Sequence, residues 1–264
     1  MNVQLLLIDP QNDFCDSKGN LFVAGATDDM KRLAKMIKRL TSKIDDIHVT
    51  LDSHRVVDIA HPIFWTNSKN QHPNPFTLIT VNDVDSGVWR ATNPGMQKRA
   101  VEYVHSLDAN KRYCLCIWPE HCIIGTWGHS VFPEVSDALL DWERKNFGLV
   151  DYVTKGSNPY TEHYSAVKAD VPDPEDPNTQ LNRPLLDILA TADIIPVAGE
   201  ARSHCIANTL FDIANNFGEE NIKKICLLSD ATSDVTGFEN LGKDFVKEMV
   251  GRGMQISTTV DFLK

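Results

Sequence analysis

Short apolar segments alternate with amphipathic segments along the chain, and this alternation constrains the fold more than any other feature. The apolar segments are rich in Val, Ile and Leu without polar alternation, which is typical of parallel strands covered on both faces. They occupy residues 3–8, 47–51, 113–117, 152–154, 194–198, 225–228 and 255–260. Helical periodicity marks residues 28–42, 94–107, 135–146, 181–190, 204–216 and 237–252. The sequence therefore predicts an α/β fold with a mostly parallel sheet and helices on both sides.

Two stretches interrupt this rhythm, at about residues 62–90 and 170–178. The first is long and aromatic, and the second, DVPDPEDPN, is acidic and rich in proline. Each is typical of a surface excursion, which serves as a lid or subunit contact or is a plain insertion. Since no linker divides the chain, we expect a single domain over residues 1–264.

Charge and composition exclude several classes of partner. The formal net charge of -10 argues against nucleic acid, whose phosphates need clustered Lys and Arg. No apolar run approaches the ~20 residues of a membrane span, and the first residues lack a basic leader. The six cysteines match no disulfide framework. We expect a soluble cytoplasmic protein with reduced thiols.

Reactive side chains follow several of the predicted strands. Ligands bind beyond the carboxyl ends of the strands in open parallel sheets. Asp9, Asp52 and Lys155 each end an apolar run, His121 lies four residues after another, and Cys205 follows a fifth. An acid, a cation, a thiol and metal-type ligands are therefore expected at one edge, a convergence that packing alone does not explain.

Cys205 is the candidate nucleophile. It lies at the start of a predicted helix, where free N–H groups and the helix dipole lower a thiol pKa and can hold an oxyanion. A buried structural cysteine is the alternative, and it would be preferred for a lone Cys. Asp9 could likewise be a turn residue and Lys155 a surface lysine. Asp13 suits the turn better, however, and Lys155 precedes Gly156 at a strand end.

Asp52 and His54 are separated by one residue, so an extended backbone points both side chains the same way. With a distant histidine they could form a three-ligand metal site open to water. His121 is the best third ligand and His61 the candidate for a fourth. The alternative is a set of polar loop residues that bond to the backbone.

Together these residues resemble a known family. The blocks are IDPQNDF at residues 8–14, LDSH at 51–54, WPEHCIIGT at 118–126, VTKG at 153–156 and AGEARSHCIANT at 198–209. In this order they are similar to the nicotinamidases, within the isochorismatase-like cysteine hydrolases. LDSH or VTKG alone would carry little weight.

The resemblance implies a three-layer α/β/α sandwich and a catalytic triad of Asp9, Lys155 and Cys205. It also implies a divalent metal, usually zinc but also iron or manganese, on Asp52, His54 and His121, with His61 in the region of a further ligand. A cis peptide is implied at Glu200–Ala201, with the amides of Ala201 and Cys205 as the oxyanion hole. Phe14 and Trp118 match aromatic positions that sandwich the pyridine ring, although Phe14 could equally be a core residue.

The expected activity is nicotinamidase, which converts nicotinamide and water to nicotinate and ammonia through a thioester. The long stretch 62–117 and the unusual Glu200, Arg202 and Ser203 leave the substrate open. Another small amide, ureido or carbamoyl compound is an alternative, and a catalytically silent ligand-binding protein is a second. We expect the substrate to be a small-molecule amide. We also expect the protein to form a homo-oligomer.

Overall fold

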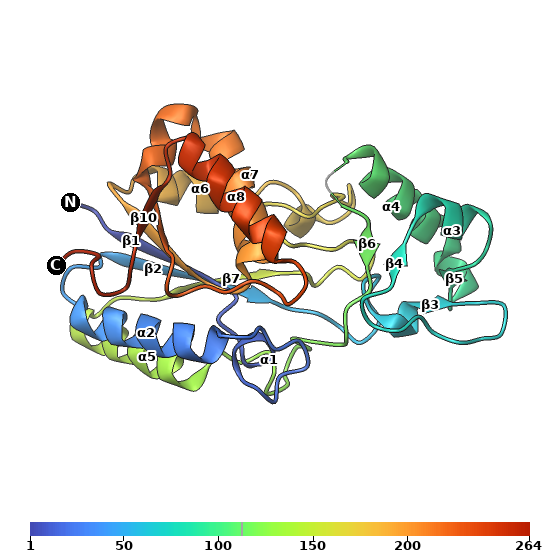
Figure 1. Cartoon of the computed structure of the whole chain (residues 1–264), viewed down its shortest axis with the longest axis horizontal. Coiled ribbons are helices and arrows are strands. Elements are labelled where there is room, and N and C mark those ends of the chain that lie inside the picture. The colour runs from blue at the N-terminus through green and yellow to red at the C-terminus, as the bar shows by residue number, and fades with distance from the viewer. Residues whose placement is uncertain (112) are drawn as a thin grey trace.

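Six parallel strands form the central sheet, in the order β10-β9-β8-β1-β2-β7 (Figure 1). The computed structural model describes residues 1–111 and 113–264. The strands of this sheet are β1 (Gln4–Ile8), β2 (Asp46–Asp52), β7 (Asp151–Lys155), β8 (Ile195–Gly199), β9 (Ile225–Leu228) and β10 (Gln255–Ser257). All residues of β1, β8 and β9 are buried, which explains their continuous apolar sequences.

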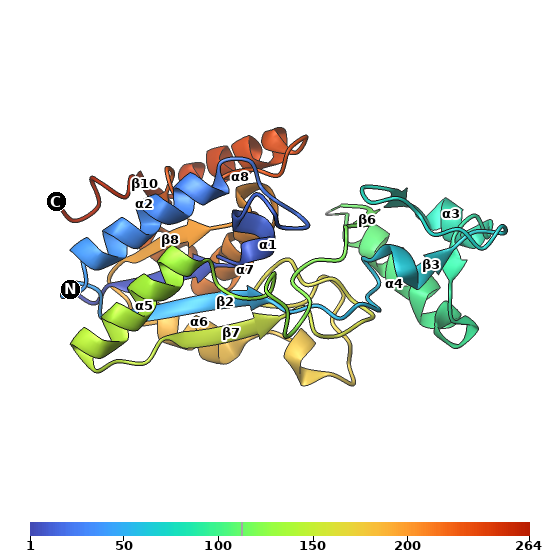
Figure 2. The same ribbon diagram turned by 90° about the horizontal axis from the view of Figure 1, so that it is seen from below.

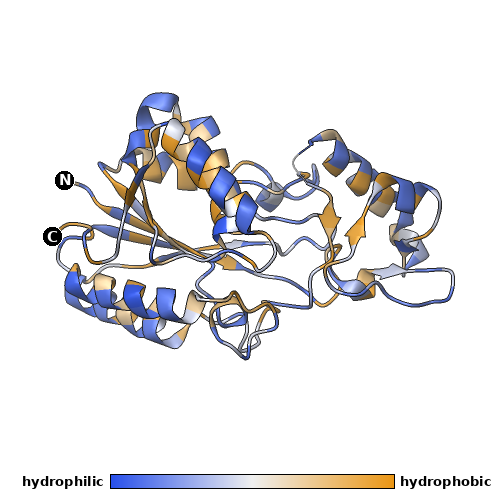
Figure 3. Ribbon diagram, in the orientation of Figure 1, coloured by the Kyte–Doolittle hydropathy of each residue, from blue (hydrophilic) through white to orange (hydrophobic). Residues whose placement is uncertain are grey.

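Helices cover both faces of this sheet and complete the expected sandwich. On one face lie α2 (Ala26–Arg39) and α5 (Pro133–Asn146), packed side by side. The other face carries α6 (Arg183–Ala190), α7 (Ala207–Phe217) and α8 (Glu239–Gly251). Apolar residues colour the central strands and stripes along the helices (Figure 3), as amphipathic helices on a core require. The three-layer α/β/α prediction is confirmed.

One predicted strand is wrong in its placement. Residues 113–117 do not join the central sheet. Only β6 (Leu115–Cys116) is extended there, and it pairs antiparallel with β4 (Leu78–Ile79) in a separate ribbon. Both β6 residues are buried, so the apolar pattern correctly predicted burial but could not tell which sheet would bury them.

The long aromatic stretch belongs to a lobe beside the carboxyl ends of the central strands (Figure 2). Besides β4 and β6, the lobe holds an antiparallel pair, β3 (Trp65–Thr66) and β5 (Arg90–Ala91), with helices α3 (Val81–Asp85) and α4 (Gln97–Ala109). The predicted helix at 94–107 is therefore real but packs within the lobe rather than on the sheet. The residues on either side of this lobe, His61 and Trp118, both reach the candidate site.

The remaining elements are short. They are helix α1 (Asn12–Cys15), 3-10 turns at Pro62–Phe64, Pro94–Met96, Pro177–Thr179 and Glu219–Lys224, and a π-helical turn at Arg202–Ile206. In the described part of the chain, no helix combines the length and apolar character that crossing a membrane requires.

Candidate active site

Strand register brings three reactive side chains to the same edge of the sheet. Asp52 on β2 is directly opposite Lys155 on β7, so their side chains lie on the same face. Asp9 follows β1, whose last residue pairs with Gly199 at the end of β8. A Cβ atom on Gly199 would lie 1.9 Å from the Ile8 carbonyl oxygen, so only glycine allows this close approach.

Asp9, Lys155 and Cys205 meet as predicted from their strand ends. The Lys155 Nζ lies 2.9 Å from Asp9 Oδ2 and 3.7 Å from the Cys205 Sγ. Exposed fractions are 0% for Asp9, 3% for Lys155 and 6% for Cys205, so the cluster is almost fully shielded from solvent. Thr50 Oγ donates a 2.5 Å hydrogen bond to Asp9 Oδ1, which fixes the carboxylate toward the lysine.

Burial and neighbouring charges shift the pKa of each group in this cluster. Burial raises the pKa of the Cys205 thiol well above its ordinary value, against the opposing effect of Lys155. Burial likewise raises the pKa of Asp9, again opposed by Lys155. Burial opposes the charge of Lys155, but Asp52 and Asp9 outweigh it and raise the pKa of the ammonium. These shifts favour a neutral thiol beside an ammonium group and make Asp9 a stronger base than an ordinary carboxylate.

The expectation that a helix start lowers the thiol pKa is wrong. Cys205 lies inside the π-helical turn Arg202–Ile206, and α7 begins only at Ala207. The thiol is also buried among apolar groups, which disfavours its ionised form. Ionising the thiol therefore needs a base, and the Asp9 carboxyl group lies within hydrogen-bond reach of the Cys205 thiol.

The backbone before Cys205 offers a free amide at Ala201. The Gly199 amide donates to the Ala231 carbonyl, Glu200 to Ile8 and Arg202 to Ser233. Between them, the Ala201 amide has no acceptor in the described part of the chain. Ala201 and Cys205 both line the cavity at the thiol, and the Glu200–Ala201 peptide bond is cis, as the resemblance predicted.

A second cluster lies next to the first and contains the metal-type residues. One ligand atom each from Asp52, His54 and His121 lies within 4.8 Å of the others. The His61 ring is 5.3 Å from the His54 ring and 5.5 Å from the His121 ring, measured between centroids. Asp52 joins the two clusters, because its Oδ1 lies 3.0 Å from Lys155 Nζ while its Oδ2 lies 3.0 Å from His54 Nε2.

The hydrogen bonds of the three histidines fit a cation. Each Nδ1 contacts an oxygen: Asp58 Oδ2 at 3.0 Å from His54, the Pro119 carbonyl at 2.8 Å from His121 and the Arg55 carbonyl at 3.1 Å from His61. Such bonds place the proton on Nδ1 and leave Nε2 as the donor atom for a metal. The buried His61 Nε2 has no hydrogen-bond partner in the described residues, and burial lowers the pKa of His61 to about 4.

Chain segments outside the central sheet position these histidines. Residues 118–123 run alongside residues 54–60, since the Trp118 amide donates to the Ala60 carbonyl and the His54 amide to the Cys122 carbonyl. The buried Asp13 side chain accepts the Cys122 amide at 2.6 Å and so holds the turn after His121.

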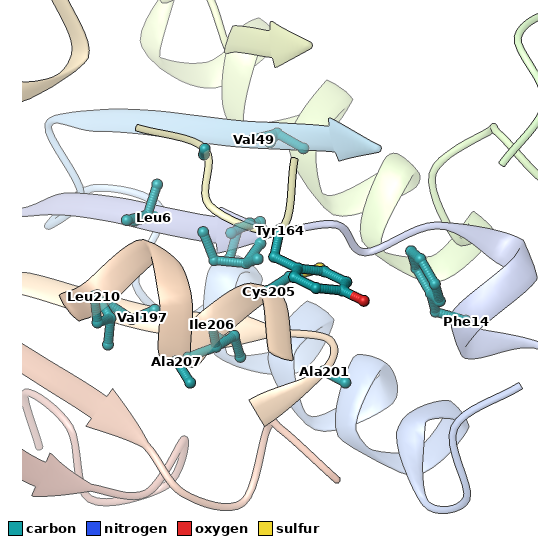
Figure 4. Packing of buried hydrophobic residues seen from close by; sticks show 14 of the residues in the cluster. Leu6, Phe14, Val49, Tyr164, Val197, Ala201, Cys205, Ile206, Ala207 and Leu210 are labelled. Atoms are coloured by element: carbon teal, nitrogen blue, oxygen red, sulfur yellow. The ribbon is translucent and has the colours of Figure 1, made fainter. Parts of the chain in front are cut away.

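The thiol faces a narrow cavity of about 30 Å³. Phe14 and Trp118, exposed by 5% and 2%, both line it with Cys205, so both are core residues and cavity walls at once. Figure 4 shows the Tyr164 ring beside the Cys205 sulfur and Phe14 farther along. A larger cavity of about 390 Å³ adjoins it and shares Tyr164 and His204 as walls.

Sequence reasoning missed Glu162, Tyr164 and His204, which also line the thiol cavity. Glu162 Oε1 lies 3.9 Å from His54 Nε2, and burial raises the pKa of Glu162 to about 8. Its position seven residues after Lys155 on the same edge was the available signal. No sequence pattern predicted that Tyr164 and His204 line the cavity, although His204 directly precedes the candidate nucleophile Cys205.

Comparison with known proteins finds solved structures with a similar fold. No model of a protein family matches the sequence, and no curated protein does either. Solved structures do match. The yeast nicotinamidase Pnc1p has a TM-score of 0.67 at 19% identity, covering 96% of this chain and 98% of that one. A nicotinamidase/pyrazinamidase from Acinetobacter baumanii has a TM-score of 0.65 at 19% identity, covering 99% and 98%. The pyrazinamidase of Pyrococcus horikoshii in complex with zinc has a TM-score of 0.57 at 18% identity, covering 98% and 99%. This chain therefore shares, over nearly its whole length, the fold of these nicotinamidases and pyrazinamidases.

Proposed function

We propose that this protein is a metal-dependent cysteine amidohydrolase that converts nicotinamide and water to nicotinate and ammonia. The observation that carries the proposal is the Lys155 ammonium, 2.9 Å from Asp9 and 3.7 Å from the Cys205 sulfur in a buried cluster. Structures with the same fold include the yeast enzyme bound to the inhibitor nicotinaldehyde and a Leishmania infantum protein in complex with nicotinate. Those ligands support a pyridine as the substrate ring.

Acylation begins with the thiol proton. Asp9 accepts it, and Lys155 stabilises the thiolate that forms beside it. The sulfur attacks the carboxamide carbon, the C–S bond forms and the carbonyl electrons move to oxygen. The amides of Ala201 and Cys205 then hold the oxyanion, an interaction worth ~3 kcal/mol of barrier for each donor. Asp9 returns its proton to nitrogen as the C–N bond breaks, which releases ammonia and leaves a thioester.

Deacylation uses the same groups in reverse. A water molecule loses a proton to Asp9 and attacks the thioester carbon, and the C–S bond then breaks to release the acid. The thiolate recovers a proton from Asp9, which restores the neutral thiol. Lys155 keeps its charge throughout, because both Asp52 and Asp9 favour the ammonium.

Asp52, His54 and His121 would hold a divalent ion, for which we propose zinc, with His61 beside them as a supporting residue. When bound, the ion supplies a Lewis acid at the wall of the thiol cavity. Phe14 and Trp118 would flank the substrate ring, since both line that cavity with Cys205. Asp52 would neutralise charge on both sides, toward Lys155 and toward the ion.

A bulkier carboxamide is the second candidate substrate. The thiol cavity is narrow, while the adjoining cavity of about 390 Å³ shares Tyr164 and His204 with it. Movement of these two rings would join the spaces and admit a substituted ring. The assembly of the chain into a homo-oligomer stays a prediction, which light scattering on the purified protein checks.

Ammonia release from nicotinamide tests the proposal directly. We expect turnover by the wild type with added zinc and none by Cys205→Ala. A parallel series of substituted pyridine carboxamides and ureido compounds decides between the two substrate classes. Absence of ammonia release from every amide in the series, by folded zinc-loaded protein, would refute the amidohydrolase.

A further inference from the structure

Glu200 is a buried carboxyl group that the proposed reaction does not use. Its exposed fraction is 0%, and it lies immediately before Ala201, which lines the thiol cavity and whose amide has no acceptor in the described residues. Among titratable groups, Asp29 of α2, Cys15 of α1 and Arg202 interact with Glu200. Asp29 also pairs with Arg32, and Arg202 forms an ion pair with Asp234.

Segment 231–235 binds the chain on both sides of Ala201, and Ser233 is its central contact. The Ser233 carbonyl accepts the Arg202 amide at 2.8 Å, and the Ser233 amide donates to Glu200 Oε2 at 3.0 Å. Its hydroxyl donates to Asp29 Oδ2 at 2.5 Å. Glu200 therefore holds, through one serine, the backbone that presents the Ala201 amide.

The contact between Glu200 and Asp29 requires a proton. Glu200 Oε1 has no donor in the described part of the chain, while the Asp29 carboxylate lies within hydrogen-bond reach of Glu200. Two carboxyl groups are stable side by side only when one carries a proton. Burial, followed by the charge of Asp29, raises the pKa of Glu200 well above its ordinary value of 4.5.

We propose that protonated Glu200 is a positioning residue, which clamps Ser233 and Asp29 together and thereby aims the Ala201 amide at the reacting carbonyl oxygen. This inference rests on the proposed function, because the amide matters only if an oxyanion forms. Loss of the Glu200 proton places two anions in one buried site and loosens the clamp. Activity and stability should then fall together as pH rises.

The sign of the stability effect follows from proton linkage. The folded protein binds the Glu200 proton more tightly than the unfolded chain does, so that contribution is fully present below the ordinary carboxyl pKa. It is lost as pH rises through the raised pKa of the folded state. Glutamine keeps an acceptor for the Ser233 amide and a donor for Asp29, but it cannot titrate.

Glu200→Gln and Glu200→Ala are the test variants, with Glu134→Gln as a control on the exposed start of α5. We expect E200Q to keep kcat within about twofold at pH 7 and to exceed the wild type increasingly at alkaline pH. E200A should lower kcat about 100-fold with little change in KM, since a misaimed group affects the transition state. The control should follow the wild type at every pH.

Melting temperatures from pH 6 to pH 9 provide a second readout that needs no substrate. The wild-type Tm should fall relative to that of E200Q as pH rises. Parallel curves, or an E200A variant with wild-type kcat, would overturn the clamp, and so would a tenfold loss of kcat in E200Q. If E200A does not fold, the comparison of E200Q with the wild type decides. Failure of the proposed function shows instead as no amide turnover by the wild type, which leaves the Tm comparison intact.

Discussion

The two clusters at the sheet edge differ in how far the protein itself completes them. In the triad cluster, Lys155 contacts Asp9, Asp52 and the Cys205 sulfur, so its charge is balanced without any ligand. In the histidine cluster, the buried His61 Nε2 has no hydrogen-bond partner in the described chain, and His54 Nε2 lies 3.0 Å from Asp52 Oδ2 and 3.9 Å from Glu162 Oε1. The triad cluster thus balances its charges with its own residues, whereas the histidine cluster offers ligand atoms from Asp52, His54 and His121 that could hold a cation. Substitutions in the triad cluster should therefore lower catalytic activity or stability. Substitutions in the histidine cluster should lower metal affinity.

Cys205→Ala gives the sharpest test of the triad cluster. We expect ammonia release to fall at least about 1,000-fold, because no other group at the cavity can form the thioester. Steady-state turnover of nicotinamide measures this effect. The matched control is Cys226→Ala on β9, a buried thiol that lies outside the thiol cavity. Equal activity of both variants would remove Cys205 from the mechanism.

Lys155→Met should damage both activity and stability. Two buried carboxylates would lose their shared cation, which costs roughly 3–5 kcal/mol when one partner of a buried pair is removed. Urea unfolding measures this loss, with the exposed Lys145→Met as the control. A variant as stable as the wild type would contradict the view that Lys155 compensates the buried charges of Asp9 and Asp52.

His121→Ala should act through the metal instead. Zinc at 100 times its dissociation constant stabilises a folded protein by about 2.7 kcal/mol, so it should raise the Tm of the wild type. The variant should lose most of this zinc-dependent shift while its metal-free Tm changes little. His105→Ala, which removes an exposed histidine of α4, should keep the full shift. A zinc response in His121→Ala equal to that of the wild type would reject His121 as a ligand.

His61→Ala should have the smallest effect. Its ring adjoins the cluster, and a supporting position of this kind typically alters metal affinity 10- to 100-fold. Calorimetric titration with zinc measures the change. A loss as large as that of His121→Ala would promote His61 to a full ligand, and no loss would make it a packing residue.

The same contrast explains what the sequence could predict. Asp9, Asp52 and Lys155 follow strands with continuous apolar patterns, and the register of a parallel sheet brings such strand ends together. His121 was predicted from the end of the apolar run 113–117, which does not join the central sheet; residues 118–123 reach the site along residues 54–60 instead. Glu162 and the Glu200 clamp escaped because their meaning depends on burial and on partners distant in sequence, which no local pattern encodes.

The attachment of the lobe has a mechanical consequence. The chain leaves the framework immediately after His61 and returns immediately before Trp118, so each stalk of the lobe ends in a residue of the site. Arg99 on α4 provides a third connection between the lobe and the rest of the molecule, because it stacks on Tyr160 and pairs with Asp173. Any tilt of the lobe would move an imidazole and an indole together, so the histidine cluster and the wall of the thiol cavity would change shape as a unit.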